Sequence, residues 1–383
     1  MRLIACVLFL AACSGGPSQN LNPDGGGGLP PKGTSTRAQL ANTLRGHSNF
    51  LIGLGNDLAN DHDKDGAYTL GSTLDLHYAY LVGLKGQGGW TDWNAGGTFV
   101  DVLADAAKRH DTSPMFTLYS MAAWGEGNAS VLTNDMYMSA YWDGAKLLFQ
   151  RLGTLDVPAV VHLEPDFWGF IMQQSKDAKM TVHVKALAAD CSALTDDLAG
   201  MGQCLLVLAR KYAPKTLVGF HASEWGGSPA EIITFFKAIG ADHADFVATD
   251  ALDRDAGCFE AHTDPNCMRG GTTGWYLDES NAQSPNYHEH FAWVKQITDG
   301  LTLPMMWWQV PLGVPSNTPG GSAGHYRDNH VHYFFAHTDE MIAAGGFGMV
   351  FGTGAGNQTF IDSDGGQLKT AAANYLAHPA ALP

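Results

Sequence analysis

Eight short apolar runs, each rich in β-branched or aromatic residues, recur along this sequence of 383 residues. They lie near residues 50–55, 75–82, 115–121, 159–164, 216–222, 245–250, 304–310 and 347–352. Most of the runs are continuously apolar instead of alternating, which is typical of parallel strands buried on both faces. The pattern therefore predicts a sheet that other elements cover on each side.

Helical stretches separate most of the runs, near 96–110, 134–152, 183–213, 228–240, 286–299 and 328–344. The clearest begins at Ser228, where Pro229 suits the first helical position and Glu231 completes a capping box. Alternating strands and helices imply parallel strands joined by crossover helices, and eight such strands close a barrel. We predict an α/β fold, a single-domain (β/α)8 barrel of the TIM type.

The predicted barrel has one irregular unit and one alternative. Residues 56–73 carry no convincing helix, so we expect an irregular first unit. A doubly wound open sheet is the alternative fold, although no Gly-x-Gly-x-x-Gly follows a strand to support a nucleotide site.

The composition excludes two classes of protein. Hydrophobic residues make up 45% of the chain and charged residues 16%, which describes a globular protein and not a disordered one. The net charge of −16, with only 22 Lys and Arg, argues against nucleic acid binding, which needs clustered basic side chains. We expect a monomer whose acidity serves solubility.

The amino terminus has the features of an export signal. Arg2 precedes an apolar stretch at residues 3–10, which is too short to cross a bilayer. The four residues that end at Cys13 resemble the lipobox of bacterial lipoproteins, and an ordinary secretory signal peptide is the alternative. We predict a signal peptide at 1–12, a lipidated flexible tether rich in Gly, Pro and Ser at 13–36, and a barrel domain at 37–383. The expected location is the bacterial cell envelope, with the lipid anchor in the outer membrane or at the cell surface.

The remaining cysteines agree with export. Cys191, Cys204, Cys258 and Cys267 form an even set, which implies disulfides in an exported chain. The local pairings Cys191–Cys204 and Cys258–Cys267 are the simplest of three connectivities. Neither pair has the spacing of a zinc ribbon.

Four acidic residues lie at the ends of three successive predicted strands: Glu164, Asp166, Glu224 and Asp250. The carboxyl ends of the strands carry the chemistry in barrels of this kind. Cleavage of a glycosidic bond needs one carboxyl group that protonates the leaving oxygen and a second that attacks the sugar or activates water. Glu164 is our candidate for the acid, because burial beside His162 would raise its pKa. The sequence does not choose between Glu224 and Asp250 as its partner, and Asp166 could equally be a turn residue.

Aromatic and polar side chains cluster near the same strand ends. Indole rings offer rigid platforms whose edges still form hydrogen bonds, which suits sugar rings. The predicted substrate-binding residues are His77, Tyr78, Trp124, His162, Trp168, His221, Trp225, Trp308, Gln309 and Arg327.

Metal sites receive weaker support. Asp61, Asp63 and Asp65 match the start of a calcium loop, but Ser72 stands where such a loop needs Glu. We expect no catalytic cofactor or metal, and the partial match leaves open a structural calcium ion near these three residues.

The Glu-Pro-Asp element at residues 164–166 ends a strand, and a helix and a strand followed by Trp-Gly at 225–226 come after it. This arrangement resembles glycoside hydrolases built on α/β barrels, and the tripeptide is similar to one in family 6 cellulases. The resemblance covers about residues 158–255 and implies a barrel that hydrolyses carbohydrate.

Two departures from the resemblance matter. Family 6 barrels have fewer strands than the eight counted here. Clan A glycosidases, which share the full barrel, place a Glu nucleophile on the seventh strand, where this chain has Gln309. The second carboxylate is therefore expected at Glu224 or Asp250.

The leading hypothesis is an extracytoplasmic glycoside hydrolase that cleaves a poly- or oligosaccharide with paired carboxylates. One alternative is a non-catalytic carbohydrate-binding lipoprotein that has lost one acid, for which Gln309 is the motive. Another is a metal-dependent hydrolase on the same barrel. That alternative would use His162, Glu164, His221 and Asp250.

Overall fold

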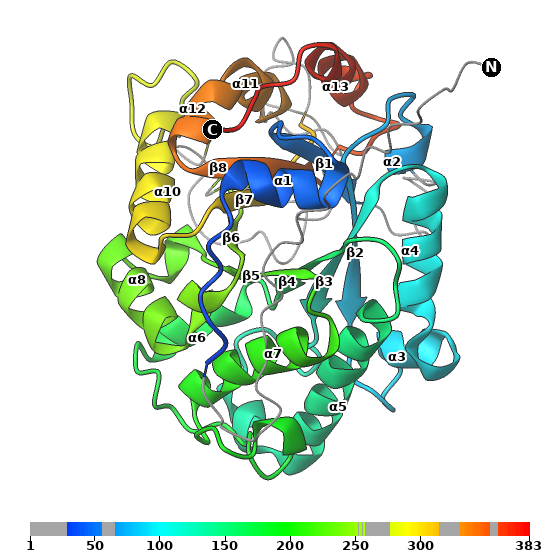
Figure 1. Cartoon of the computed structure of the whole chain (residues 1–383). Coiled ribbons are helices and arrows are strands. Elements are labelled where there is room, and N and C mark those ends of the chain that lie inside the picture. The colour runs from blue at the N-terminus through cyan, green and yellow to red at the C-terminus, as the bar shows by residue number, and fades with distance from the viewer. Residues whose placement is uncertain are drawn as a thin grey trace, which may run out of the picture.

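The computed structural model describes residues 29–55, 66–251, 253–254, 256, 276–313, 330–352 and 359–383. Its strands pair in parallel and in chain order from β1 to β8, and β8 returns to β1 to close the barrel (Figure 1). The fold prediction is confirmed: the chain is a (β/α)8 barrel of the TIM type.

Each strand falls on one of the predicted apolar runs, and its residues are almost all buried. The strands are β1 (Leu51–Gly55), β2 (Leu76–Val82), β3 (Ser113–Tyr119), β4 (Val160–Leu163), β5 (Leu217–His221), β6 (Phe246–Thr249), β7 (Met305–Val310) and β8 (Gly346–Phe351). Burial on both faces explains why the runs were continuous.

Helices surround the barrel. They are α1 (Arg37–Arg45), α2 (Gly66–Thr69), α3 (Trp90–Trp93), α4 (Phe99–Arg109), α5 (Asp135–Leu152), α6 (Phe167–Gln174), α7 (Leu198–Tyr212), α8 (Pro229–Ala238), α10 (Tyr287–Leu301), α11 (His330–Ala336), α12 (Thr338–Ala343) and α13 (Gln367–Ala377). Short 3-10 turns lie between them: η1 (Ala95–Gly97), η2 (Ala129–Thr133), η3 (Ala189–Cys191), η4 (Glu224–Gly226) and η5 (Ala241–His243).

The start of α8 confirms the predicted signals. Ser228 is the N-cap, Pro229 is the first helical residue, and Glu231 completes the capping box. The predicted helix over 328–344 is instead two helices, because the chain leaves helical geometry at His337 between α11 and α12.

The predicted helix over 183–213 is wrong in its first half, since α7 begins only at Leu198. The side chain of Asp197 caps α7 by accepting from the backbone N–H of Gly200 at 2.8 Å. The carboxylate of Asp196 accepts from the N–H groups of the two residues 184–185, which holds the preceding stretch as a loop. Local hydrogen bonds from aspartates compete with the helix there.

The disulfide Cys191–Cys204 is confirmed and joins η3 to α7, with 5.5 Å between the two Cα atoms. The second predicted disulfide, Cys258–Cys267, lies outside the described residues.

The barrel interior accommodates large side chains because glycines face them. A Cβ atom on Gly55 would lie 2.2 Å from the ring of Tyr78, its register partner on β2. A Cβ on Gly219 would lie 2.3 Å from the ring of Phe246 on the neighbouring strand. Glycine at these positions makes room for a tyrosine and a phenylalanine in adjacent strands.

Helix α1 lies at the amino-terminal end of the barrel (Figure 1). Its Arg37 donates to the carbonyl oxygens of Ile342 and Gly346 beside the start of β8, and Ser113 at the start of β3 donates to the carbonyl of Leu44 at 2.8 Å. The side chain of Leu40 is buried beneath the helix. The end of the barrel opposite the carboxyl edge is therefore closed by α1.

The segment before α1 also follows this end. The carbonyl of Pro30 lies 2.6 Å from Nδ1 of His243, and Lys32 forms an ion pair with Asp242, both in η5 just before β6. The other residues of the predicted signal peptide and tether, 1–28, lie outside the described residues. In the part that the structure describes, no helix has the length and hydropathy needed to span a membrane.

Candidate active site

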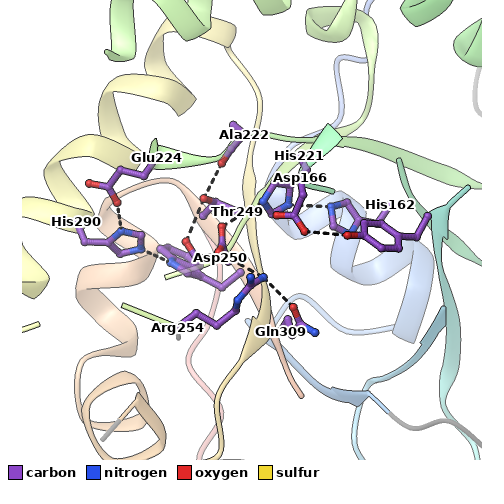
Figure 2. Close-up of polar contacts among 12 residues, drawn as sticks. His162, Asp166, His221, Ala222, Glu224, Thr249, Asp250, Arg254, His290 and Gln309 are labelled. Atoms are coloured by element: carbon purple, nitrogen blue, oxygen red, sulfur yellow. Dashed lines mark hydrogen bonds and ion pairs between the residues drawn. The ribbon is translucent and has the colours of Figure 1, made fainter. Parts of the chain in front are cut away.

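A chain of hydrogen bonds crosses the carboxyl end of the barrel from β4 to β6 (Figure 2). Nε2 of His162 lies 3.0 Å from Nδ1 of His221, and Nε2 of His221 lies 3.2 Å from Oδ1 of Asp250. All three side chains are buried. The ring of Trp308, which enters the barrel from β7, lies 4.8 Å from that of His162 and 5.6 Å from that of His221. The interior of the barrel therefore holds the two histidines in fixed positions.

The same chain continues from β6 to β7 and β2. Oδ2 of Asp250 lies 3.5 Å from Nη1 of Arg254, and the same nitrogen donates to Oε1 of Gln309 at 2.8 Å. The amide nitrogen of Gln309 then donates to the hydroxyl of Tyr80 at 2.6 Å. Both ends of the Gln309 amide are thus engaged, and its oxygen faces the guanidinium.

The ionisation state of Asp250 determines which nitrogen of His221 carries a proton. Burial raises its pKa, but Arg254 and the hydrogen bond to His221 outweigh burial and hold the pKa at about 2. Because Asp250 is ionised and can only accept, Nε2 of His221 carries the proton in their contact and donates it to the carboxylate. Burial and the neighbouring His221 lower the pKa of His162 well below its usual value, so His162 stays neutral.

Asp166 lies at the entrance of α6 with a different environment. It lines a small open hollow on the surface together with Tyr119, Glu126 and Phe170. Burial and the charges of Asp250 and Glu126 raise its pKa, and Arg254 opposes them. Oδ2 of Asp166 lies 3.4 Å from the hydroxyl of Tyr119, and that hydroxyl also contacts Glu126. A protonated Asp166 can donate to the Tyr119 oxygen while Tyr119 donates to Glu126.

Glu164 does not join these groups. Its φ of 49° turns the chain at the end of β4. Its carboxyl group accepts from the backbone N–H groups of Ser120 at 3.3 Å and Met121 at 3.0 Å, and the residue is fully buried. Burial, and after it the charge of Glu164, raises the pKa of Tyr141, a residue of α5. Burial raises the pKa of Glu164 to about 8.

Glu224 is also outside the hydrogen-bond chain that runs through His221 and Asp250 (Figure 2). Its Oε2 lies 2.8 Å from Nδ1 of His290 in α10, and Nε2 of His290 accepts from the indole N–H of Trp307 at 2.9 Å. Because an indole nitrogen can only donate, Nδ1 of His290 must carry the proton that goes to Glu224. These two hydrogen bonds connect η4, α10 and β7. The carboxylate of Glu224 is therefore part of the contact that holds the three elements together.

The remaining predicted substrate-binding residues differ in exposure. His77 contacts Tyr68 outside β2, at 2.5 Å from its hydroxyl, and Trp168 is fully buried with its N–H on the carbonyl of Leu163. Tyr78 is buried inside the barrel. Trp225 is partly exposed, with its ring 4.8 Å from that of Phe170, which lines the hollow.

Trp124 is 40% exposed, and it lies in the loop that supplies the residues around Glu126 to the hollow. Arg327 and the predicted calcium ligands Asp61, Asp63 and Asp65 lie outside the described residues.

Two residues that line the hollow, Tyr119 and Glu126, were not among the site residues predicted from the sequence. Tyr119 lies within the third apolar run and is the last residue of β3, and Glu126 stands between Gly125 and Gly127 in the loop that follows. A polar residue at a strand end beside a glycine-rich loop was the available signal, but an exposed loop acid does not differ in sequence from a solubilising one.

The described residues offer no group of three or more His, Cys, Asp or Glu side chains arranged to hold a metal ion. His162, His221 and Asp250 bond to one another instead, and Glu164 lies elsewhere. The metal-dependent alternative, which needs these four residues around one point, therefore gains no support from the geometry.

Comparisons with known proteins place the fold among glycoside hydrolase structures. No family model and no curated protein matches the chain. The structure of GH26C from a Muricauda species aligns with 90% of this chain and 88% of its own, at 10% identity and a TM-score of 0.53. The GH26 β-mannanase BoMan26A from Bacteroides ovatus aligns with 90% of this chain and 94% of its own, at 9% identity and a TM-score of 0.49. At such identities the likeness establishes the barrel fold alone.

The endoglucanase CEL6B from Humicola insolens aligns with 55% of this chain and 60% of its own, at 16% identity and a TM-score of 0.32. That score is too low to argue from. The similarity to family 6 cellulases accordingly stays a prediction.

Proposed function

We propose that this protein is a glycoside hydrolase that cleaves a poly- or oligosaccharide at the carboxyl end of its barrel. The observation that carries the proposal is the contrast between Asp166 and Asp250. The pKa of Asp166 is raised by burial and by neighbouring acids, whereas Arg254 and His221 hold the pKa of Asp250 at about 2. Two carboxyl groups whose environments separate their pKa values are the usual basis of an acid and a base in one site.

Asp166 is the proposed general acid. Its side chain reaches the open hollow, where a protonated Asp166 can donate a hydrogen bond to the oxygen of the Tyr119 hydroxyl, 3.4 Å from Oδ2. A sugar oxygen in the hollow would replace Tyr119 as the acceptor and leave as an alcohol. This revises the sequence hypothesis, which gave the role to Glu164, because the oxygens of Glu164 are occupied by backbone N–H groups.

Asp250 is the proposed ionised partner. Arg254 and His221 keep its carboxylate charged, so it can attack the anomeric carbon or deprotonate a water molecule. His221 then holds the carboxylate in place, and His162 holds the ring of His221 from its other side.

The test is the release of reducing ends from soluble polysaccharides by the wild-type protein and four variants. Asp166→Asn and Asp250→Asn should each lower the rate by about 10²–10⁴-fold. Glu164→Gln and Glu224→Gln should retain activity, because backbone N–H groups and His290, respectively, already engage these two carboxyl groups. Thermal melting of each variant controls for misfolding. Full activity in Asp166→Asn, or its loss in Glu164→Gln with the fold intact, would return the acid role to Glu164.

A non-catalytic carbohydrate-binding function is the second candidate. Gln309 occupies the seventh strand where clan A enzymes have a carboxylate, and its amide is fixed between Arg254 and Tyr80. This function predicts saturable sugar binding with no reducing ends released by the wild-type protein.

We also propose that the protein is exported and lipid-anchored through Cys13, which the lipobox-like sequence supports. Fractionation of expressing bacterial cells tests this. The wild-type protein should sediment with membranes, and Cys13→Ala should not be lipidated. Equal distribution of the two proteins between fractions would contradict the anchor.

A further inference from the structure

Two tryptophans are exposed at the carboxyl end of the barrel. Trp93 in α3 is 45% exposed and Trp124 in the loop after β3 is 40% exposed. They are the aromatic residues among the exposed large hydrophobic side chains of the described chain. An exposed indole leaves much apolar area in water, so two of them in one region indicate a binding surface.

One loop holds both rings by their N–H groups. Nε1 of Trp93 donates to the carbonyl of Gly88 at 3.1 Å, and Nε1 of Trp124 donates to Oε1 of Gln87 at 3.2 Å. The loop, residues 83–89, follows β2, and the carboxylate of Asp92 accepts from its backbone N–H groups at 86 and 88. Gln87 and Gly88 are consecutive, so neighbouring residues of one loop hold the N–H groups of both indoles.

Each ring is also supported on one side. Trp93 meets Phe99 at 4.9 Å between ring centroids and 86° between planes, and Trp124 meets Tyr137 at 5.1 Å and 77°. A perpendicular contact uses at most one face of an indole, so each tryptophan keeps a ring face that this contact does not cover. Rigid support with an uncovered face is the form of a stacking platform.

The surface is continuous with the hollow of Asp166. Trp124 lies between Ala122 and Glu126, which both line that hollow. The succession from Asp166 to Trp124 and then across Gln87 to Trp93 follows the carboxyl ends of β4, β3 and β2. A chain of sugars that leaves the hollow on this side would cross both indoles.

We propose that Trp93 and Trp124, the tryptophan pair, bind sugar rings of a neutral polysaccharide that extends from the hollow over loop 83–89. The inference rests on the proposed function, since it takes the hollow as the site of cleavage. The substrate class is an uncharged polymer longer than a disaccharide. The net charge of −16 and the carboxylate of Asp92 in this surface disfavour an anionic chain.

The binding test uses native gels that contain hydroxyethyl cellulose, galactomannan or soluble starch, one polymer to a gel. Asp166→Asn serves as the background, so that cleavage does not alter the gel. At least one polymer should retard this protein, and Trp93→Ala/Trp124→Ala should weaken the retardation roughly tenfold or more, as truncation of interface tryptophans does. Trp93→Phe/Trp124→Phe should recover part of it. Val102→Ala, an exposed apolar residue of α4, is the matched control.

A kinetic arm separates the pair from the proposed function. In the active protein, the double alanine variant should raise KM for the retarding polymer and leave the turnover of its short oligosaccharides unchanged. Retardation that needs the pair without any hydrolysis by the wild type would uphold the pair and reject the hydrolase. Hydrolysis with polymer KM unchanged in the double variant, or no retardation by any of the three polymers, would overturn the pair.

Discussion

Arg254 lies between the carboxylate of Asp250 and the amide of Gln309, and it bears directly on the protonation of the barrel mouth. Removing its charge in Arg254→Met should raise the pKa of Asp250, because a favourable charge is lost while burial remains. The acidic limb of the pH profile of kcat/KM should move upward by about 1 pH unit or more.

Arg254→Lys is the control for this prediction, since it keeps a positive charge and loses the planar contact to Gln309. Its acidic limb should lie between those of the wild type and Arg254→Met. An acidic limb that stays in place in Arg254→Met would remove Asp250 from the mechanism.

Glu164 should make stability depend on pH. Its folded pKa of about 8 exceeds the ordinary value of 4.5, so the folded protein holds a proton that the unfolded chain releases. The stabilisation is complete below the unfolded pKa and is lost as the pH rises through about 8. Melting curves at about pH 5 and about pH 8 should therefore show a larger fall for the wild type than for Glu164→Gln.

Asp250→Asn is the control variant in the same melting experiment. Asp250 has a lowered pKa, so its contribution is present at both of these pH values and gives no such difference. Equal falls in the wild type and Glu164→Gln would show that Glu164 is ionised in the folded protein.

The side-chain directions at the mouth could not be predicted from the sequence. Alternation along a strand would place Glu164 beside His162 inside the barrel. A positive φ of 49° at Glu164 and 65° at Asp166 breaks that alternation. Glu164 therefore turns to the backbone N–H groups at residues 120 and 121, and Asp166 reaches the hollow. Such angles are uncommon in residues other than glycine, and no pattern in the sequence predicts them.

At the scale of elements, the strands were predicted well because a strand that is buried on both faces has a continuous run of apolar residues. Helix ends were predicted where a local signal decides them, as at Ser228. The start of α7 was not, because the side chains of Asp196 and Asp197 act through backbone groups whose position only the fold determines. Helix α1 was missed because it follows a segment that composition assigned to a tether.

Substitutions in helix α1 test whether the end of the barrel that α1 closes affects stability without affecting activity at the opposite end. Leu40→Ala removes a buried side chain and should lower the free energy of unfolding by about 2–5 kcal/mol. The activity of the folded variant should not change, because α1 contacts the end opposite the mouth.

Chemical denaturation followed by activity assays in the absence of denaturant checks both parts of this prediction. Asn42→Ala, at an exposed position of α1, should change stability by no more than about 0.5 kcal/mol. Lost activity in a well-folded Leu40→Ala would mean that the two ends are coupled.

At the scale of the whole molecule, the carboxyl terminus returns to the end of the barrel that α1 closes. The N–H of Leu382 donates to the carbonyl of Ser48 at 2.8 Å, and Ala381 pairs with Asn49 just before β1. A folded domain fused after residue 383 should therefore leave KM for the polymer unchanged. The same domain inserted at Gln87 should raise it. Equal effects of the two fusions on KM would contradict this placement of the polymer.

The course of residues 29–37 shows at which end of the barrel the chain enters. This segment passes η5 and reaches the start of β8, so the chain before it joins the barrel at the end opposite its mouth. A protein attached to a bilayer through that side would present its mouth to the surrounding medium and its closed end to the lipid. A polymer too large to approach the membrane could then be bound from outside, while the protein itself stays at the cell.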